Sequence, residues 1–318
     1  MSNSPVIVWL RRDLRLSDHP AFSAAAQTGR SVIVVFIHDD QVAALGAAPK
    51  WRLGLGLDSF AKRLSEKGQR LVFRRGAALD VLRALIAETG AGAVYWSRLY
   101  DPAAMARDSA VKSALKSDGI DAKSFGGHLM FEPWTVETKT GGFYKVYTPF
   151  WKTVKDRDVE APLQAPSNLP APDAWPESDA LEDWHMGAAM NRGADIVRPY
   201  VRLGEEAAQS RLGGFISGIV AGYDTTRDLP AVDGTSGLSQ NLSLGEISPH
   251  QCWHAGVRAL HEGKKGAETF LKELVWREFA YHLMHHTPRI LTDNWKEDWN
   301  AFPWNTDETA ARAVSYTH

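Results

Sequence analysis

Short apolar runs alternate with helix-length segments over the first 130 residues. The runs predict five strands, the last of them the weakest: Val6–Leu10, Val32–His38, Arg70–Arg74, Ala93–Ser97 and Ala122–Phe125. The segments between them predict four helices: Ser17–Thr28, Trp51–Lys67, Ala77–Thr89 and Ala103–Ser117. Strands that alternate with helices are typical of a parallel sheet covered on both faces. The pattern therefore predicts a doubly wound, Rossmann-like α/β domain over residues 1–130.

Ligands of such a sheet bind at the carboxyl ends of its strands. Three polar segments are predicted to lie at that edge: Arg11–Arg15, His38–Asp40 and Trp96–Asp101. No G-x-G-x-x-G motif follows any predicted strand, so a standard dinucleotide site is not expected in this half of the chain.

The pattern changes after this α/β region. Residues 131–195 are predicted to connect two domains, with a short helix at Thr148–Lys155 and a surface linker at Glu160–Pro176, which holds five prolines. From about residue 196 only helices are predicted: Gly204–Ala221, Ser248–Glu262 and Ala267–His286. Ser248 and Gln251 form a capping-box pattern around Pro249, which favours a helix start there. Residues 196–318 therefore read as an all-α domain.

Composition and charge are those of an ordinary globular protein. The 318 residues are 44% hydrophobic and 23% charged, and the net charge is -2. No overall positive field favours nucleic acid, so any DNA contact must come from a local patch. The one cysteine, Cys252, excludes an internal disulfide and a Cys-based zinc site. No apolar run is long enough to span a bilayer, which predicts a cytoplasmic protein with no membrane contact.

Two segments carry candidate chemistry. Residues 233–239, DGTSGLS, combine hydroxyls with flexible backbone, which suits either a phosphate-cradling loop or an ordinary connector between helices. The segment Phe270–Ala280 places Glu273, Trp276 and Arg277 on neighbouring ridges of one helix. Glu273 then either pairs with Arg277 on the surface or points into a cavity. His282, His285 and His286 follow on this helix, but without a clear third ligand from elsewhere no metal site is predicted.

Five segments, in order, identify a family: VIVWLRRDLRLSDHPAF, FYKVYTPFW, YDTTRDLPAVDGTSGLS, GEISPHQCWH and ELVWREFAYHL. Together they resemble the DNA photolyase/cryptochrome family, specifically a class I cyclobutane pyrimidine dimer photolyase. The resemblance runs from Val6 to about Val314, and Ser315–His318 do not continue it. On this basis the chain is expected to be truncated, with an incomplete FAD-binding domain.

The resemblance implies a flavoprotein enzyme, a deoxyribodipyrimidine photo-lyase that breaks carbon–carbon bonds. Its activity would be light-dependent repair of pyrimidine dimers in DNA by electron transfer from excited FADH⁻, with no obligate protein partner. The cofactors would be FAD in the helical domain and an antenna chromophore in the α/β domain. The antenna stays open between methenyltetrahydrofolate and deazaflavin, because Ala103-Ala104 stand where some relatives have an Asn-Glu pair. Activity of this length of chain also stays open.

The resemblance also assigns roles to single residues. The FAD contacts would be Tyr223, Thr235, Ser236, Gly237, Leu238, Ser239, Phe270 and Arg277. The DNA contacts would be Arg227, Glu273, Trp276 and Arg277. Glu273 and Trp276 would act on the dimer, and Trp304 would be the outer tryptophan of an electron relay. A glutamate donates a hydrogen bond only when protonated, so Glu273 is expected to hold a proton when the dimer is bound.

Two other functions compete with repair. A cryptochrome-like photoreceptor would bind flavin and signal to partner proteins, but Glu273 beside Trp276 favours repair. A non-flavin, nucleotide-binding α/β protein with a helical appendage would require the five matching segments to be accidental.

Overall fold

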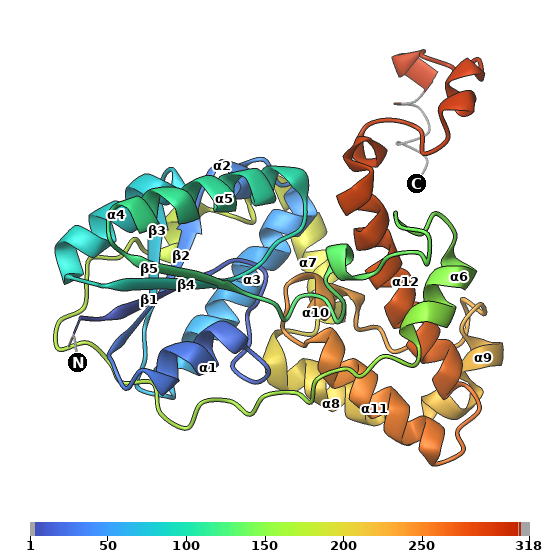
Figure 1. Ribbon diagram of the computed structural model, residues 1–318, viewed down its shortest axis with the longest axis horizontal. Coiled ribbons are helices and arrows are strands. Elements are labelled where there is room, and N and C mark those ends of the chain that lie inside the picture. Colours follow the sequence, from blue (N-terminus) through green and yellow to red (C-terminus); the bar gives the residue numbers. More distant parts are fainter. Residues whose placement is uncertain (1–3, 311, 313–318) are drawn as a thin grey trace.

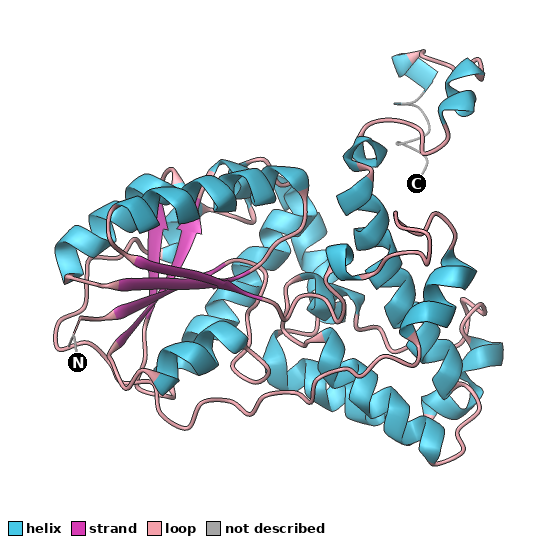
Figure 2. Ribbon diagram, viewed as in Figure 1, coloured by secondary structure: helices cyan, strands magenta, loops and turns pink. Residues whose placement is uncertain are grey.

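The structure is a computed structural model that describes residues 4–310 and 312. Its N-terminal half is built on a five-stranded, all-parallel sheet in the order β3-β2-β1-β4-β5 (Figures 1 and 2). The strands are β1 (Val6–Leu10), β2 (Val32–His38), β3 (Leu71–Arg75), β4 (Ala93–Ser97) and β5 (Asp121–Phe125). The bounds of β1, β2 and β4 match the prediction. Strand β3 is shifted by one residue at both ends, and β5 begins one residue earlier than predicted.

Alternate residues of each strand face opposite layers of helices. Val6, Val8 and Leu10 join a core with α1 and α3, whereas Ile7 and Trp9 join a core with α4 and α5. The helices of this half are α1 (Pro20–Gln27), α2 (Asp40–Ala43), α3 (Ala47–Ser65), α4 (Ala78–Thr89) and α5 (Pro102–Ser117). Because both faces of the sheet are covered, its strands read as continuous apolar runs. The predicted doubly wound α/β domain is confirmed.

The C-terminal half of the described chain is helical. Its longer helices surround a second core that contains Phe215, Trp253 and Phe270. The α-helices from residue 147 on are α6 (Tyr147–Val154), α7 (Gly193–Val197), α8 (Gly204–Ser217), α9 (Tyr223–Thr226), α10 (Ser239–Ser243), α11 (Pro249–His261) and α12 (Ala267–His286). Short 3-10 helices are η1 (Pro133–Thr135), η2 (Leu181–Trp184), η3 (Ala188–Met190), η4 (Arg198–Tyr200), η5 (Ile219–Gly222), η6 (Pro288–Leu291) and η7 (Glu297–Ala301).

Local sequence signals account for the ends of these helices. Ser248 and Gln251 form the predicted capping box at the start of α11. Helix α12 ends at His286, directly before Thr287 and Pro288. Among residues 4–310 and 312, no helix is both long and apolar enough to span a bilayer.

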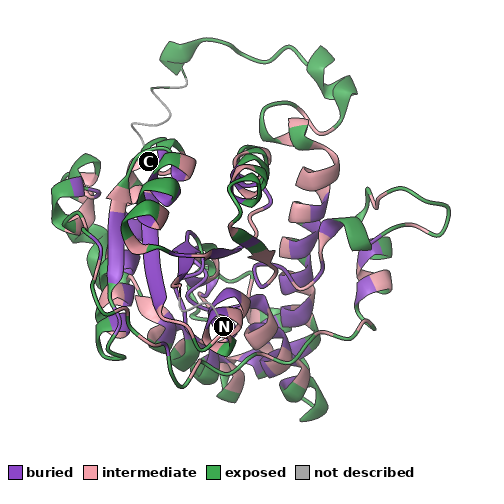
Figure 3. Ribbon diagram, turned by 60° about the vertical axis from the view of Figure 1, so that its left-hand side comes forward, coloured by how far each residue is buried: buried purple, intermediate pink, exposed green. Residues whose placement is uncertain are grey.

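The connection between the two halves packs against both of them. Phe131 and Phe150 belong to the helical core, whereas Leu169 and Trp184 belong to the core on the α1 face of the sheet. Figure 3 shows buried residues in the sheet and along α12, with exposed residues in the segment beyond α12. The connection therefore helps to fix how the helical half is placed on the α/β half.

Buried polar groups also cross between the halves. Arg52 on α3 donates to Glu246 Oε2 at 2.5 Å, and Asn241 donates to the same oxygen at 2.6 Å. The buried Arg15 guanidinium donates to the carbonyl oxygens of Gly245 and Gly127, at 2.9 and 3.0 Å. The bonds from Arg52 to Glu246 and from Arg15 to Gly245 join the α/β half to the segment before α11.

Gly245 permits that close approach. Its φ is +64°, and a Cβ built there would lie 2.2 Å from the carbonyl oxygen of Arg12. Any larger residue would meet both a strained backbone conformation and a steric clash. The backbone of the helical half can therefore lie directly against the loop after β1.

Removing the Glu246 carboxylate is expected to destabilise the chain strongly. Glu246→Ala leaves Arg52 buried without its counter-charge, which typically costs about 3–5 kcal/mol. Asp58→Ala, which breaks the exposed Lys62–Asp58 pair, should cost at most about 1 kcal/mol. Denaturant unfolding of both variants measures the difference, and equal losses would contradict the structural role of Glu246.

Candidate functional site

Helices α9 and α12 lie side by side, and an ion pair joins them. Arg227, which follows α9, pairs through Nη1 with Glu273 Oε1 of α12. The Arg227 guanidinium also lies 5.7 Å from the ring centroid of Tyr223. The hydrogen bond to Glu273 raises the pKa of Arg227. The alternative in which Glu273 pairs with Arg277 is therefore wrong.

Trp276 lies one turn further along α12 and is 46% exposed. One face of its indole stacks on Tyr147, with ring centroids 3.6 Å apart and planes 7° apart. The edge of Phe279 lies against the same side chain at 5.8 Å. Since one face is covered and nearly half of the residue is exposed, the other face is open to solvent.

Arg277 points away from Glu273, toward the α/β half. Its Nη1 donates to the carbonyl oxygen of His128 at 2.9 Å and to Glu278 Oε1 at 3.1 Å. Successive helix residues are rotated by about 100°, which gives Arg277 a different direction from Trp276. The structure does not bring Arg277 into the cluster of Arg227, Glu273 and Trp276, and its cofactor and DNA contacts stay predictions.

Glu278 anchors α12 to the segment after β5. Its Oε2 accepts the backbone N–H groups of Met130 at 2.8 Å and Phe131 at 3.1 Å. The side chain is fully buried, and this burial raises the pKa of Glu278 to about 7, although Arg277 and the two N–H groups favour the charged form.

Two of the predicted flavin contacts, Tyr223 and Phe270, are buried with Phe215. The ring of Phe270 lies 4.9 Å from Phe215 and 6.2 Å from Tyr223. Burial raises the pKa of the Tyr223 hydroxyl, which is therefore a neutral phenol at physiological pH. Of these rings, Tyr223 lies next to the Arg227 guanidinium, and the contact of Tyr223 and Phe270 with flavin stays a prediction.

The loop of residues 233–239 offers unused donors. Among the described residues, no partner engages the side-chain hydroxyls of Thr235, Ser236 or Ser239. Arg211 on α8 donates from Nε to the carbonyl oxygen of Ser236 at 2.5 Å, and it lies against Gly237, whose φ is +57°. Leu238 is buried and fixes the loop to the helical core. Hydroxyls beside a guanidinium fit a phosphate-bearing ligand, and the phosphate cradle stays a prediction beside the reading as a connector.

Trp304 is not brought to this cluster. It is 55% exposed and packs on Phe302 at 4.7 Å, in the segment that extends beyond the C-terminal end of α12 (Figure 1). Its role in an electron relay stays a prediction.

The histidines near the end of α12 bond to backbone. His282 Nε2 accepts the N–H of Tyr144 at 3.0 Å, and His286 Nε2 bonds to the carbonyl oxygen of Pro133 at 3.2 Å. Burial lowers the pKa of His282 to about 4. Within residues 4–310 and 312, no three His, Cys, Asp or Glu side chains are arranged to hold a metal ion.

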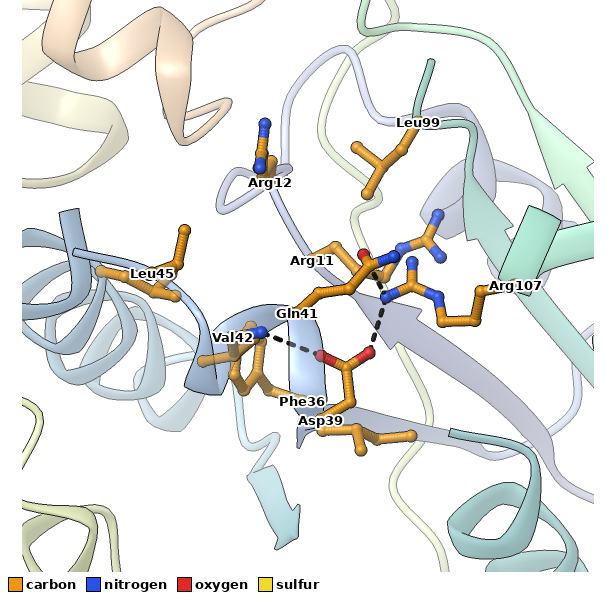
Figure 4. A pocket seen from close by; sticks show the side chains of 11 residues that line it. Arg11, Arg12, Phe36, Asp39, Gln41, Val42, Leu45, Leu99 and Arg107 are labelled. Atoms are coloured by element: carbon orange, nitrogen blue, oxygen red, sulfur yellow. Dashed lines mark hydrogen bonds and ion pairs between the residues drawn. The ribbon is translucent and has the colours of Figure 1, made fainter. Parts of the chain in front are cut away.

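A small cavity of about 40 Å³ opens at the carboxyl ends of β1 and β2 (Figure 4). Arg107 donates to Asp39 Oδ2 at 2.6 Å and to Gln41 Oε1 at 2.7 Å on its wall. Arg12 is exposed at the rim, without a side-chain partner among the described residues. The polar edge predicted from the strand order is therefore a real concavity with a free cation.

Sequence reasoning missed three residues of these sites: Tyr147, Arg211 and Glu278. Tyr147 lies in the segment FYKVYTPFW, one of the five that carry the family resemblance, but nothing in that segment indicates a role for Tyr147. No local pattern points to Arg211, since only the fold brings α8 to the loop of residues 233–239.

Comparisons with known proteins identify the family of this chain. The family model "DNA photolyase" matches residues 6–171, and the model "FAD binding domain of DNA photolyase" matches residues 270–317. A deoxyribodipyrimidine photo-lyase of Agrobacterium fabrum is 42% identical over 98% of this chain and 66% of its own length. Cryptochrome-1 of Arabidopsis thaliana is 29% identical over 96% of this chain and 47% of its own. The chain therefore belongs to the DNA photolyase/cryptochrome family.

A solved structure refines the class. The crystal structure of a bacterial class III photolyase from Agrobacterium tumefaciens superposes with a TM-score of 0.94 at 42% identity, covering 98% of this chain and 65% of that one. The class I assignment from sequence is therefore unsupported. The family match to residue 317 also extends the resemblance beyond Val314. Val314 and Ser315–His318 lie outside the described residues, and the chain spans about two thirds of the length of the relatives it matches.

The raised pKa of Glu278 predicts a pH dependence of stability. The pKa of an unfolded glutamate is about 4.5 and that of native Glu278 is about 7, so between these values the native state holds a proton that the unfolded state has released. Stability must then fall as pH rises through this window. Glu278→Gln should flatten the fall by about 1–3 kcal/mol in urea unfolding at pH 5 and pH 7. An equal change of slope in Glu268→Gln, the matched control on the same helix, contradicts the assignment.

Proposed function

We propose that this chain is part of a light-driven DNA repair enzyme that binds FAD and reverses cyclobutane pyrimidine dimers. The observation that carries the proposal is the open indole face of Trp276 beside the Arg227–Glu273 pair. Two photolyases at 42% identity support repair, and the one of solved structure, a bacterial class III photolyase, favours that class.

Trp276 suits a base that has left the duplex. Bases stack on aromatic side chains with about 1–3 kcal/mol per base. A base can reach the exposed indole only when it is extruded, and a dimer that already weakens stacking and pairing lowers the cost of extrusion. Trp276 can therefore stack on an unpaired base, and the free-energy cost of extruding that base is low only where the DNA is damaged.

Arg227 and Glu273 provide two coupled contacts. A DNA phosphate is a strong partner for a guanidinium, so it competes with Glu273 for Arg227. Once released, the Glu273 carboxyl is able to hold a proton and donate it as a hydrogen bond to a carbonyl oxygen of the dimer. Binding of the phosphate thereby prepares Glu273 to stabilise added charge on the lesion.

The residues around the loop of 233–239 fit FAD. The hydroxyls of Thr235, Ser236 and Ser239, with Arg211, would hold the diphosphate, while Tyr223 and Phe270 provide the apolar floor. Bound there in its reduced form, FAD would provide the light-driven electron donor for the dimer. We assign the antenna chromophore, a methenyltetrahydrofolate or a deazaflavin, to the α/β half; the cavity of Figure 4, at about 40 Å³, is too small to hold it.

Replacing Glu273 tests the repair role directly. Glu273→Ala should lower the yield of dimer repair under blue light about 10- to 100-fold, because a donor aimed at developing charge is lost. FAD content, read from visible absorbance, should not change. Glu268→Ala on the same helix is the control. Loss of flavin together with activity would show that Glu273 builds the cofactor pocket, and absence of repair in the flavin-loaded wild type would favour a photoreceptor.

Replacing Arg227 tests the phosphate contact. Arg227→Ala should weaken binding of damaged and undamaged single strands alike, and it should reduce the slope of log affinity against log salt by about one. Arg83→Ala removes an exposed arginine of the α/β half that pairs with Asp118, and it should leave the slope as it is. A slope unchanged in Arg227→Ala would remove this residue from the phosphate contacts.

A further inference from the structure

Among the described residues, two aromatic rings pack against Trp276 and no hydrogen bond fixes its indole. Its indole N–H has no acceptor among the described residues. The only aromatic rings recorded against it there are the face of Tyr147 and the edge of Phe279. An exposed side chain held by no hydrogen bond would otherwise sample several rotamers. The parallel contact with Tyr147, at 3.6 Å and 7°, is therefore what selects the plane of the indole.

Tyr147 is itself fixed to the same turn of α12. Its hydroxyl donates to the carbonyl oxygen of Lys272 at 2.7 Å. In an α-helix this carbonyl also accepts the N–H four residues later, which belongs to Trp276. The phenol is thus tied to the backbone turn whose side chain it supports, and burial, with the nearby Glu273 carboxylate, raises the pKa of Tyr147 and keeps it a donor.

The segment around Tyr147 is clamped along α12 on both sides. Phe143 stacks on His286 with ring centroids 4.8 Å apart and planes 7° apart. Phe150 is buried and packs on Phe279 at 5.2 Å. Tyr147 therefore lies between two aromatic residues that are both packed on α12, which fixes the position of its backbone.

We propose that Tyr147 is a positioning residue that presents the open face of Trp276 to one base of a pyrimidine dimer, and thereby sets the preference for damaged over undamaged DNA. The inference rests on the proposed function. The bound state would be three stacked layers, Tyr147, Trp276 and the extruded base, with Glu273 one turn away at the edge of that base. Because the indole is oriented before DNA binds, the binding free energy is not reduced by the entropy cost of ordering this side chain.

The experiment compares two substitutions at Tyr147 with a matched control. Tyr147→Leu keeps an apolar side chain but removes the ring, Tyr147→Phe keeps the ring but removes the bond to Lys272, and Tyr144→Phe removes the hydroxyl that bonds to Thr153. The measured quantity is the ratio of affinities for dimer-containing and undamaged single strands. It should fall about tenfold in Tyr147→Leu, about twofold to threefold in Tyr147→Phe and not at all in Tyr144→Phe.

A second measurement needs no DNA. The chain is labelled with 5-fluorotryptophan, and the resonance that disappears in Trp276→Phe is that of Trp276. In Tyr147→Leu this ¹⁹F resonance should shift and broaden. The resonances of the other tryptophans should stay unchanged, which shows that the fold is intact. An unchanged Trp276 resonance overturns the inference. So does a shifted resonance with an unchanged affinity ratio. A wild-type chain that does not discriminate at all overturns the proposed function, and the inference with it, whatever the ¹⁹F spectrum shows.

Discussion

The buried carboxylate of Glu278 fixes the rotation of α12, and the site on the other side of that helix depends on it. Two backbone N–H groups from the segment after β5 and the Arg277 guanidinium converge on this one side chain. Glu278 lies five residues after Glu273, which at about 100° per residue separates their directions by about 140°. When Glu278 is bound to the segment after β5, Glu273 must therefore face away from that segment, toward α9.

This constraint explains why the same short motif, WREF, serves two purposes. Trp276 faces the solvent and the ring of Tyr147, whereas Arg277 and Glu278 face the α/β half. The charged residues of the motif bond to the chain around them, and the aromatic residue is the one that keeps an exposed face. A helix that carries a binding face and an anchoring face cannot turn without losing both.

The fold was largely predictable because it follows from local periodicity. Buried parallel strands give apolar runs, and Gly90 closes α4 in the left-handed conformation that a helix end favours. The site was predictable only in part. Glu273 and Trp276 are visible on one helix, but the partner of Glu273 is Arg227, 46 residues away, and not the neighbour Arg277. Spacing along a helix gives the possible pairs, whereas packing between helices decides which pair forms.

The two candidate ligand sites depend on different cores. Tyr147, Arg227 and Glu273 come from α6, α9 and α12 or their ends, which share the helical core, so their mutual distances do not depend on the sheet. The cavity of Figure 4 is set by the carboxyl ends of β1 and β2, within the other cores. What holds the two sites at a constant separation is the set of buried polar contacts between the halves, from Arg52, Arg15 and Glu278. Hydrogen bonds and ion pairs depend on distance and direction more strongly than apolar contacts do, so a polar interface limits sliding of one half over the other. An interface of this kind keeps the cavity of Figure 4 and the cluster around Trp276 at a fixed distance and orientation.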